Sequence, residues 1–278
     1  MSKLIVTHVS PDLDGIPAIW LLRKFHPDFK NARIAFVPAG STYNNEPPDS
    51  NVDIVHVDTG MGKFDHHQTS EFTCGAQRVY EYLVSEGYVK DDEALGRMVK
   101  ILTEIDHGWD NYKWPDPDND RNEFFVHNVL SGIKILYPNQ DEKYVEWVTF
   151  QIEAIYKLLQ AKVRAEQEMK DGKKFKTRWG EGLAVYTSNS TILELGIKKG
   201  IAVVVIKDPK RGNIRVTGLN SKKVDFTKAY EMILKRDKVG NWFLHASKVL
   251  LRNGSIRNPT MKASPLSLDD MIDILEKA

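Results

Sequence analysis

The chain has almost no cysteine and no long apolar run, and both absences restrict its class. Cys74 is the only cysteine among 278 residues, so an internal disulfide is excluded. No stretch approaches the roughly 18 uninterrupted apolar residues of a membrane span. The first residues enter a strand pattern directly, without the hydrophobic core of a signal peptide. We therefore expect a soluble protein of the reducing cytoplasm with no membrane partner.

The net charge of +1 conceals an uneven distribution along the chain. Residues 160–262 contain 23 lysines and arginines against 9 aspartates and glutamates. The whole chain has 39 lysines and arginines and 38 aspartates and glutamates. The rest of the chain therefore has 16 basic and 29 acidic residues. Two solvated surfaces of opposite sign would explain this partition. Cation binding in the acidic part and anion binding in the basic part would explain it equally well.

Hydrophobic periodicity predicts an α/β fold with a parallel sheet in the first part of the chain. Short β-branched runs at 3–9, 33–40 and 52–60 end in Pro, Gly or Asp, as buried parallel strands do. A helical pattern lies between the first two runs, which completes a strand-helix-strand unit. Helical spacing recurs at 75–87 and 92–106. We expect this sheet to be covered by helices.

A long helix without Pro or Gly is predicted from Asp141 to about Lys170. After a predicted turn at 171–182, three further strand patterns and one helical pattern indicate a second, smaller α/β domain. At roughly 100 to 200 residues per domain, the length is also that of a two-domain protein. We predict three parts: a metal-binding catalytic domain at 1–150, a connecting helix at 151–175 and a basic substrate-binding domain at 176–278.

Histidines and aspartates gather where the predicted strands and helices of the acidic part end. A lone Asp in such a place is typically a helix cap or a turn residue, and Asp14 could cap the next helix. Their coincidence favours a metal site, because carboxylates at one sheet edge repel one another unless a cation holds them. Five of the eight histidines lie beside carboxylates: His8, His56, His66, His67 and His107. Mixed imidazole and carboxylate donors suit Mn²⁺, Fe²⁺, Co²⁺ or Zn²⁺, with Mg²⁺ in the more oxygen-rich sites.

The motifs in this region resemble the four motifs of the DHH phosphoesterase superfamily. They are H-V-S-P-D-L-D at 8–14, V-D-T-G at 57–60, D-H-H at 65–67 and the helix-end Asp106, in order over residues 1 to about 110. The superfamily includes RecJ-type exonucleases, oligoribonucleases, cyclic dinucleotide phosphodiesterases and family II inorganic pyrophosphatases. The run D-H-H-Q is also similar to the branch typified by the MYG1 exonucleases, whose first motif differs from this one.

The resemblance implies two divalent metal ions, Mn²⁺ first, with Mg²⁺ or Co²⁺ as alternatives. Asp58 would bridge the two ions and so take part in catalysis. The other implied ligands are His8 and Asp12 on one ion, and Asp14, His66 and Asp106 on the second. Two such ions would activate a water for attack on phosphorus.

The resemblance leaves His67 as a catalytic residue that contacts a phosphoryl oxygen or protonates the leaving group. Asp65 and His56 are expected to support the metal ligands from behind, since a ligating histidine usually needs a partner. Asp65 would orient an imidazole. His107 is expected to be mainly structural.

The second domain lacks the glycine-rich G-G-G-H segment with which the family commonly holds the substrate phosphate. The nearest stretch is 243–259, whose candidate phosphate-binding residues are His245, Asn253, Gly254, Ser255 and Arg257. An Asn-Gly turn with a solvated arginine is the alternative interpretation. Aromatic residues in this part could stack nucleobases or pack in the core: Trp179, Trp242 and Phe243.

The function predicted first is a metal-dependent phosphodiesterase or exonuclease that hydrolyses short oligonucleotides or single-stranded nucleic acid. Lysines and arginines distributed over the second domain favour a phosphate backbone as substrate. A small-molecule phosphatase or inorganic pyrophosphatase is the second prediction, and a non-catalytic metal-binding regulator is the third. The complete ligand set argues against the regulator.

Overall fold

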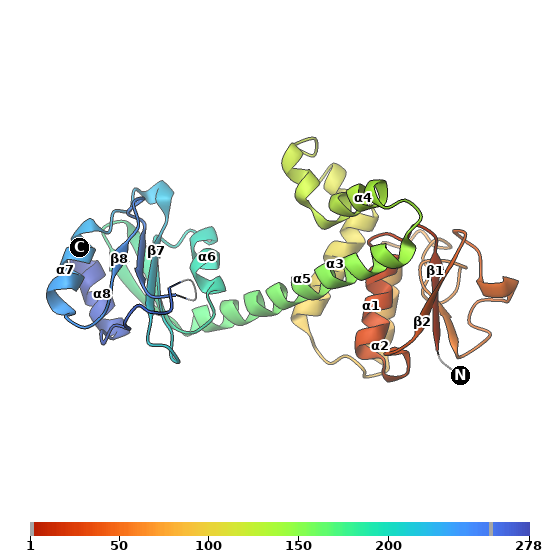
Figure 1. Ribbon diagram of the computed structural model, residues 1–278, viewed down its shortest axis with the longest axis horizontal. Helices are drawn as coiled ribbons and strands as arrows, with labels where there is room; N and C mark the ends of the chain where they lie inside the picture. Colours follow the sequence, from red (N-terminus) through yellow and green to blue (C-terminus); the bar gives the residue numbers. More distant parts are fainter. Residues whose placement is uncertain (1–2, 256–257) are drawn as a thin grey trace. The chain divides into compact units, whose positions relative to one another are not determined.

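The computed structural model describes residues 3–255 and 258–278, which form two compact units, Met1–Leu159 and Gln160–Ala278 (Figure 1). The boundary falls inside the long helix α5 (Asp141–Lys170). The predicted fold class is confirmed, with a parallel N-terminal sheet, a second and smaller α/β unit, and the long helix between them in the chain. No helix of the described part of the chain is long and apolar enough to cross a membrane.

Three parallel strands form the sheet of the first unit, in the order β2-β1-β3. They are β1 (Leu4–His8), β2 (Arg33–Val37) and β3 (Ile54–His56). The central strand β1 is the most apolar, and Ile5 and Val6 are completely buried. Because the strands run in one direction, their carboxyl ends meet at one edge of the sheet, where His8 and Asp58 lie.

Helix α1 (Gly15–Phe25) lies against this sheet (Figure 1). The further helices of the unit are α2 (Gly75–Ser85), α3 (Glu93–Asp106) and α4 (Val126–Leu136), with short 3-10 turns at Pro27–Phe29, Tyr43–Asn45, Trp109–Asn111 and Asp120–Phe124. Helix α1 is buried from Gly15 to Leu22 and packs against α2, which packs in turn against α3. The first part of α5 adds Val148 and Ile152 to the same core. The helix ends that carry Asp14 and Asp106 are thereby brought to the sheet edge.

The second unit contains a six-stranded mixed sheet in the order β4-β5-β6-β7-β9-β8, parallel only between β5 and β6. Its elements are β4 (Lys173–Thr177), β5 (Gly180–Tyr186), α6 (Thr191–Lys198), β6 (Val203–Lys207), β7 (Ile214–Gly218), a 3-10 turn (Asn220–Lys222), α7 (Thr227–Arg236), β8 (Phe243–Leu244), β9 (Leu250–Asn253) and α8 (Leu268–Lys277). Side chains of β6 alternate between two cores, because successive residues of a strand point to opposite faces. Val203 and Val205 pack with α7 and α8, whereas Val204 and Ile206 pack with α6 and Ala165 of α5.

The prediction of a turn at 171–182 is wrong, because this segment forms β4 and the start of β5. The two strands pair in antiparallel register from Lys173 with Ala184 to Thr177 with Gly180. Lysines occupy three of the five positions of β4, and only Phe175 is apolar and buried. Such a charged edge strand has a weak hydrophobic signal, although the charge protects the edge from pairing with other chains.

Candidate metal centre

Asp58 lies at the centre of the acidic site, two residues after the end of β3. Its backbone has a left-handed conformation with φ of 52°, which Asp tolerates better than most residues, and its side chain is 3% exposed. Oδ2 of Asp58 lies 3.1 Å from Nε2 of His8, which in turn lies 4.0 Å from Oδ2 of Asp12. These three residues from two strand ends form a first group of metal donors.

The ring of His8 is held in the orientation that a metal ligand needs. Nδ1 lies 2.8 Å from the carbonyl oxygen of Val9, and since a carbonyl only accepts, Nδ1 carries a hydrogen. Nε2 is therefore the nitrogen that faces Asp58. The hydrogen bond with Asp58 raises the pKa of His8 to about 9, more than burial lowers it. A cation between the two side chains would take the place of this proton.

His66 faces three carboxylates and forms a second donor group with two of them. Its Nε2 lies 3.5 Å from Oδ2 of Asp14, 3.6 Å from Oδ2 of Asp106 and 3.7 Å from Oδ1 of Asp58. This nitrogen is buried and has no hydrogen-bond partner among the described residues. A buried polar atom without a partner is costly. Nε2 of His66 and the surrounding oxygens fit a divalent cation.

The carboxylate of Asp14 is fixed by the first turn of α2. Its Oδ2 accepts the N–H of Gly75 and its Oδ1 accepts the N–H of Ala76, both at 2.7 Å. Asp14 precedes α1 but does not cap that helix with its side chain; Oδ1 of Asp12 instead accepts the N–H of Gly15 at 3.3 Å. The side chain of Asp14 thus uses the positive end of a helix 61 positions further along the chain.

Two glycines that the sequence analysis did not single out make room for these carboxylates. A Cβ at Gly75 would lie 3.0 Å from Oδ2 of Asp14 and 3.1 Å from the carbonyl oxygen of Phe64. A Cβ at Gly15 would lie 2.7 Å from Oγ1 of Thr7 and 3.3 Å from Oδ2 of Asp58. Each glycine is the first residue of a helix, so the only sequence signal is a Gly directly before a helical pattern.

Crowding of buried carboxylates disfavours their ionised forms. Burial, reinforced by the charges of Asp14 and Asp12, raises the pKa of Asp58 to about 8 and that of Asp106 to about 7. Burial also raises the pKa of Asp14, against the hydrogen bonds from α2. A bound cation would stabilise all of the ionised forms together, because each carboxylate would gain an opposite charge.

His67 lies beside His66, with ring centroids 4.4 Å apart, and pairs with a buried carboxylate. With Asp58 and His66 it also offers a further set of donor atoms. Its Nδ1 lies 2.7 Å from Oδ1 of Asp65 and 3.8 Å from Oδ1 of Asp58. Asp65 also accepts the backbone N–H groups of Met61, His66 and His67; although burial alone would raise its pKa, the hydrogen bonds from His67 and Met61 hold it below the usual range. The His67 side chain is 59% exposed. Asp65 thus holds one edge of a ring that is open to solvent.

Neither His56 nor His107 belongs to a donor group among the described residues. His56 is buried in β3, but its Nε2 accepts the N–H of Tyr43 at 3.0 Å, and it belongs to none of the donor groups found in the described residues. His107 follows Asp106, and its Nδ1 lies 3.1 Å from the carbonyl oxygen of Thr103. The supporting role of His56 stays a prediction, and its hydrogen bond with Tyr43 is the contact that the structure gives.

An aromatic stack that the sequence analysis missed lies beside His66. The ring of Phe72 lies 4.3 Å from the ring of His107 and 4.3 Å from that of Trp109, with the last pair stacked. The ring centre of His107 is 6.3 Å from that of His66. Phe72 is 44% exposed, so this stack borders the site with a partly open apolar surface.

The structure separates the predicted phosphate-binding residues of the second unit. Asn253 is completely buried and donates to the carbonyl oxygens of Asn241 and Lys262, so its amide is committed to the fold. Gly254 and Ser255 follow the end of β9 and line a cavity. His245 lies at the other end of β9, where its N–H donates to Leu250. Arg257 lies outside the described residues.

The aromatic residues considered for base stacking in the second unit are mostly in the core. Trp242 is 8% exposed, and its indole N–H donates to Asp237. Trp179 is half-buried and packs edge-on against Phe226. Phe243 is 51% exposed on the short strand β8. Of the three, Phe243 has the most open ring.

Comparisons with known proteins give only distant likenesses. No family model and no curated protein matches the chain. A solved structure of RecJ from Thermus thermophilus in complex with Mg²⁺ is similar at a TM-score of 0.35 and 10% identity, over 99% of this chain and 49% of that one. A structure of exonuclease RecJ bound to manganese is similar at a TM-score of 0.32 and 9% identity, over 99% of this chain and 90% of that one.

The chain spans about half the length of the first of these structures. Since both TM-scores and both identities are low, we base no functional inference on these likenesses.

Proposed function

We propose that the first unit is a divalent-metal centre of a phosphoesterase of the DHH type. The observation that carries this proposal is the buried Nε2 of His66, which lacks a hydrogen-bond partner among the described residues and faces three carboxylates at 3.5 to 3.7 Å. His8, Asp12 and Asp58 would hold one ion. Asp14, His66 and Asp106 would hold a second, with Asp58 close enough to contact both. Mn²⁺ suits this mixed donor set best, with Mg²⁺ or Co²⁺ as alternatives.

Bound divalent ions would supply Lewis acidity that polarises a phosphoryl group and makes water more acidic. His67 would move a proton. Asp65 accepts the Nδ1 hydrogen of His67 and keeps the ring from turning, which leaves Nε2 free to donate to the leaving oxygen of a phosphate ester. Because its Oδ1 holds two backbone N–H groups as well, Asp65 orients the ring without moving itself.

Short or single-stranded nucleic acid is the substrate class that we propose. The excess of basic residues in 160–262 suits a phosphate backbone, and the exposed Phe72 beside Trp109 and His107 offers a surface on which a nucleobase could stack. The first unit would then carry the chemistry and the second unit the binding of substrate. A small-molecule phosphatase or pyrophosphatase would need neither feature.

A panel of substrates with Mn²⁺ tests both levels of this proposal. Short RNA and DNA, cyclic dinucleotides, mononucleotides and pyrophosphate should separate the three predicted functions, and we expect turnover of the oligonucleotides. Oligonucleotide binding should weaken with salt, with log K falling by about 0.7 per phosphate contact and log unit of salt. Turnover of pyrophosphate alone would favour the small-molecule enzyme. Loss of all turnover with metal still bound would favour a regulator.

A further inference from the structure

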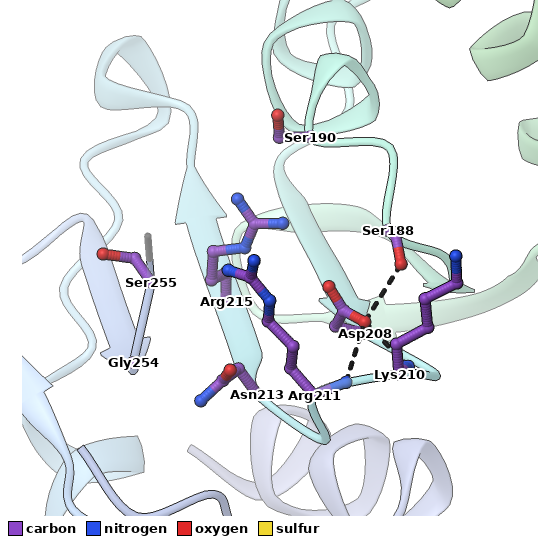
Figure 2. Close-up of a pocket in the computed structure, with 9 residues that line it drawn as sticks. All are labelled: Ser188, Ser190, Asp208, Lys210, Arg211, Asn213, Arg215, Gly254 and Ser255. Atoms are coloured by element: carbon purple, nitrogen blue, oxygen red, sulfur yellow. Dashed lines mark hydrogen bonds between the residues drawn. The ribbon is translucent and has the colours of Figure 1, made fainter. Parts of the chain in front are cut away.

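A polar cavity lies entirely within the second unit, at the end of the sheet where β6 turns into β7 (Figure 2). Its volume is about 230 Å³, below the roughly 300 to 1,000 Å³ of pockets for drug-sized ligands. Three segments line it: the loop after β5, the β6–β7 hairpin and the residues that follow β9. A cavity of this size suits a small group such as a phosphate.

Three cationic side chains line this cavity: Lys210, Arg211 and Arg215. Figure 2 shows the guanidinium groups of Arg211 and Arg215 on the same side of it, and each guanidinium lacks an ion pair or side-chain hydrogen bond within the described residues. Burial lowers the pKa of Arg215, and the neighbouring charge of Arg211 lowers it further, against the opposing effect of Asp208. Two unpaired guanidiniums held close together are a site for an anion.

The one carboxylate that lines the cavity among the described residues, Asp208, is occupied by the hairpin itself. Its Oδ1 accepts the hydroxyl of Ser188 at 3.0 Å and the N–H groups of Lys210 and Arg211 at 2.8 and 3.1 Å. Although burial alone would raise its pKa, the hydrogen bonds from Arg211, Lys210 and Ser188 hold it below the usual range. The lining therefore keeps an excess of two positive charges, and Asp208 orders the turn that presents them.

The floor of the cavity is fixed by a close contact between two loops. Nδ2 of Asn213 donates to the carbonyl oxygen of Asn253 at 2.7 Å. Gly254 has a left-handed φ of 82°, and a Cβ there would lie 2.2 Å from Nδ2 of Asn213. Only glycine fits that position, so the polar groups around it are preorganised. Preorganised donors bind an anion more strongly than mobile surface lysines, because less ordering is needed on binding.

We propose that this cavity binds the phosphate group of a small phosphorylated ligand, through Arg211 and Arg215 with the backbone and hydroxyl groups around them. Its lining residues belong to a different unit from the candidate metal centre, and the proposal does not depend on the function proposed for the first unit. It also lies at the opposite end of β7 and β9 from His245, since Ile214 pairs with Asn253 whereas Thr217 pairs with Leu250.

The test is calorimetric titration of the metal-free full chain with inorganic phosphate, pyrophosphate, and a dinucleotide with and without a 5′-phosphate. Asp58→Asn in the background prevents binding of phosphate through residual metal in the first unit. We expect Arg211→Gln with Arg215→Gln to weaken binding of inorganic phosphate at least tenfold. Arg178→Gln with Lys199→Gln removes the same charge from exposed positions of this unit outside the cavity, and should change binding less than twofold.

Each outcome of this titration supports or overturns the site. Equal losses of phosphate affinity in the two double variants would show that binding depends only on net charge, which would overturn the proposal. Absence of saturable phosphate binding to the parent chain would also overturn it. Preference for the 5′-phosphorylated dinucleotide over free phosphate would indicate the end of a nucleic acid as the source, and the reverse would indicate a small metabolite. Arg215 is half-buried; if the double variant does not fold, the exposed Arg211→Gln alone should still weaken binding.

Discussion

The candidate metal centre of the first unit and the proposed phosphate cavity of the second contain the same local hydrogen-bond arrangement but attract ligands of opposite charge. In each, two successive backbone N–H groups hold one aspartate: Gly75 and Ala76 hold Asp14, and Lys210 and Arg211 hold Asp208. The fixed Asp14 adds its negative charge to those of three other carboxylates, and the group attracts a cation. The fixed Asp208 orders a hairpin that carries two arginines, and their positive charges attract an anion. The surrounding side chains, and not the backbone device, decide the sign of the ligand.

Removal of one charge at the centre of the first site should have the largest effect. Asp58→Asn keeps the size of the side chain and a residue type that tolerates a positive φ, but removes the carboxylate that belongs to the first donor group and lies 3.7 Å from His66 of the second. We expect activity to fall by about 10³-fold or more, with metal content reduced and circular dichroism unchanged. Elemental analysis after dialysis measures the metal. A variant with full activity would contradict the role of Asp58 as a bridge.

The two adjacent histidines should separate metal binding from proton transfer. His66→Ala should lose metal affinity, because Nε2 of His66 faces Asp14, Asp58 and Asp106. His67→Ala should retain the metal and slow turnover by about 10² to 10⁴, the usual range for a general acid. Titration with Mn²⁺ and single-turnover kinetics distinguish the two. The assignment fails if both variants lose metal equally.

A single methyl group at the start of α2 should disturb the device that holds Asp14. Gly75→Ala would place a Cβ 3.0 Å from Oδ2 of Asp14 and 3.1 Å from the carbonyl oxygen of Phe64. We expect a loss of about 1 to 3 kcal/mol in the free energy of unfolding and weaker Mn²⁺ binding. Gly132→Ala is the control, since the helix α4 has open space there and alanine should stabilise it by about 0.5 to 1 kcal/mol. Denaturant titration measures both, and equal responses would disprove the steric argument.

Substitution of Asp208, the aspartate held by the hairpin of the second unit, should have the smallest effect on stability. Asp208→Asn keeps one acceptor for the hairpin N–H groups and removes the only negative charge that the described residues contribute to the cavity lining. We expect a loss of about 0.5 to 1.5 kcal/mol in stability, typical of one weakened hydrogen bond, together with tighter phosphate binding because repulsion is removed. Thermal unfolding and phosphate titration would test the pair of effects. Weaker phosphate binding with an intact fold would contradict this account, because it would mean that the Asp208 carboxylate favours phosphate binding.

The fold of the first unit could be predicted from sequence because its strands are short, apolar and bounded by turn residues. The run predicted at 3–9 contains β1 (Leu4–His8), and the helical pattern between the first two runs is α1. The edge strand β4 could not be predicted, since three of its five residues are lysines and its single buried apolar residue, Phe175, gives no alternating pattern. Strand β8 has only two residues, and β9 pairs with β7, which lies far earlier in the chain. Local periodicity identifies buried elements and says little about edges.

The candidate site could be predicted only as far as residue type and motif order allow. The motifs indicated His8, Asp58 and His66 as ligands, and the structure brings their side chains together. They could not show that Asp14 is held by α2, because that contact depends on how two helices pack. Nor could they distinguish the arginines at 211 and 215 from solvated turn residues, since their proximity results from the pairing of β6 with β7.

The two backbone hydrogen bonds that hold Asp14 would allow metal binding at the first site to be followed by amide hydrogen exchange. The amide hydrogens of Gly75 and Ala76 are protected from exchange with water by their hydrogen bonds to the oxygens of Asp14 as well as by burial. A cation that draws electron density from this carboxylate, or rotates it, would change the lifetime of those two hydrogens before any larger rearrangement. Their exchange rates make α2 a built-in reporter of site occupancy, readable by NMR in the absence of substrate.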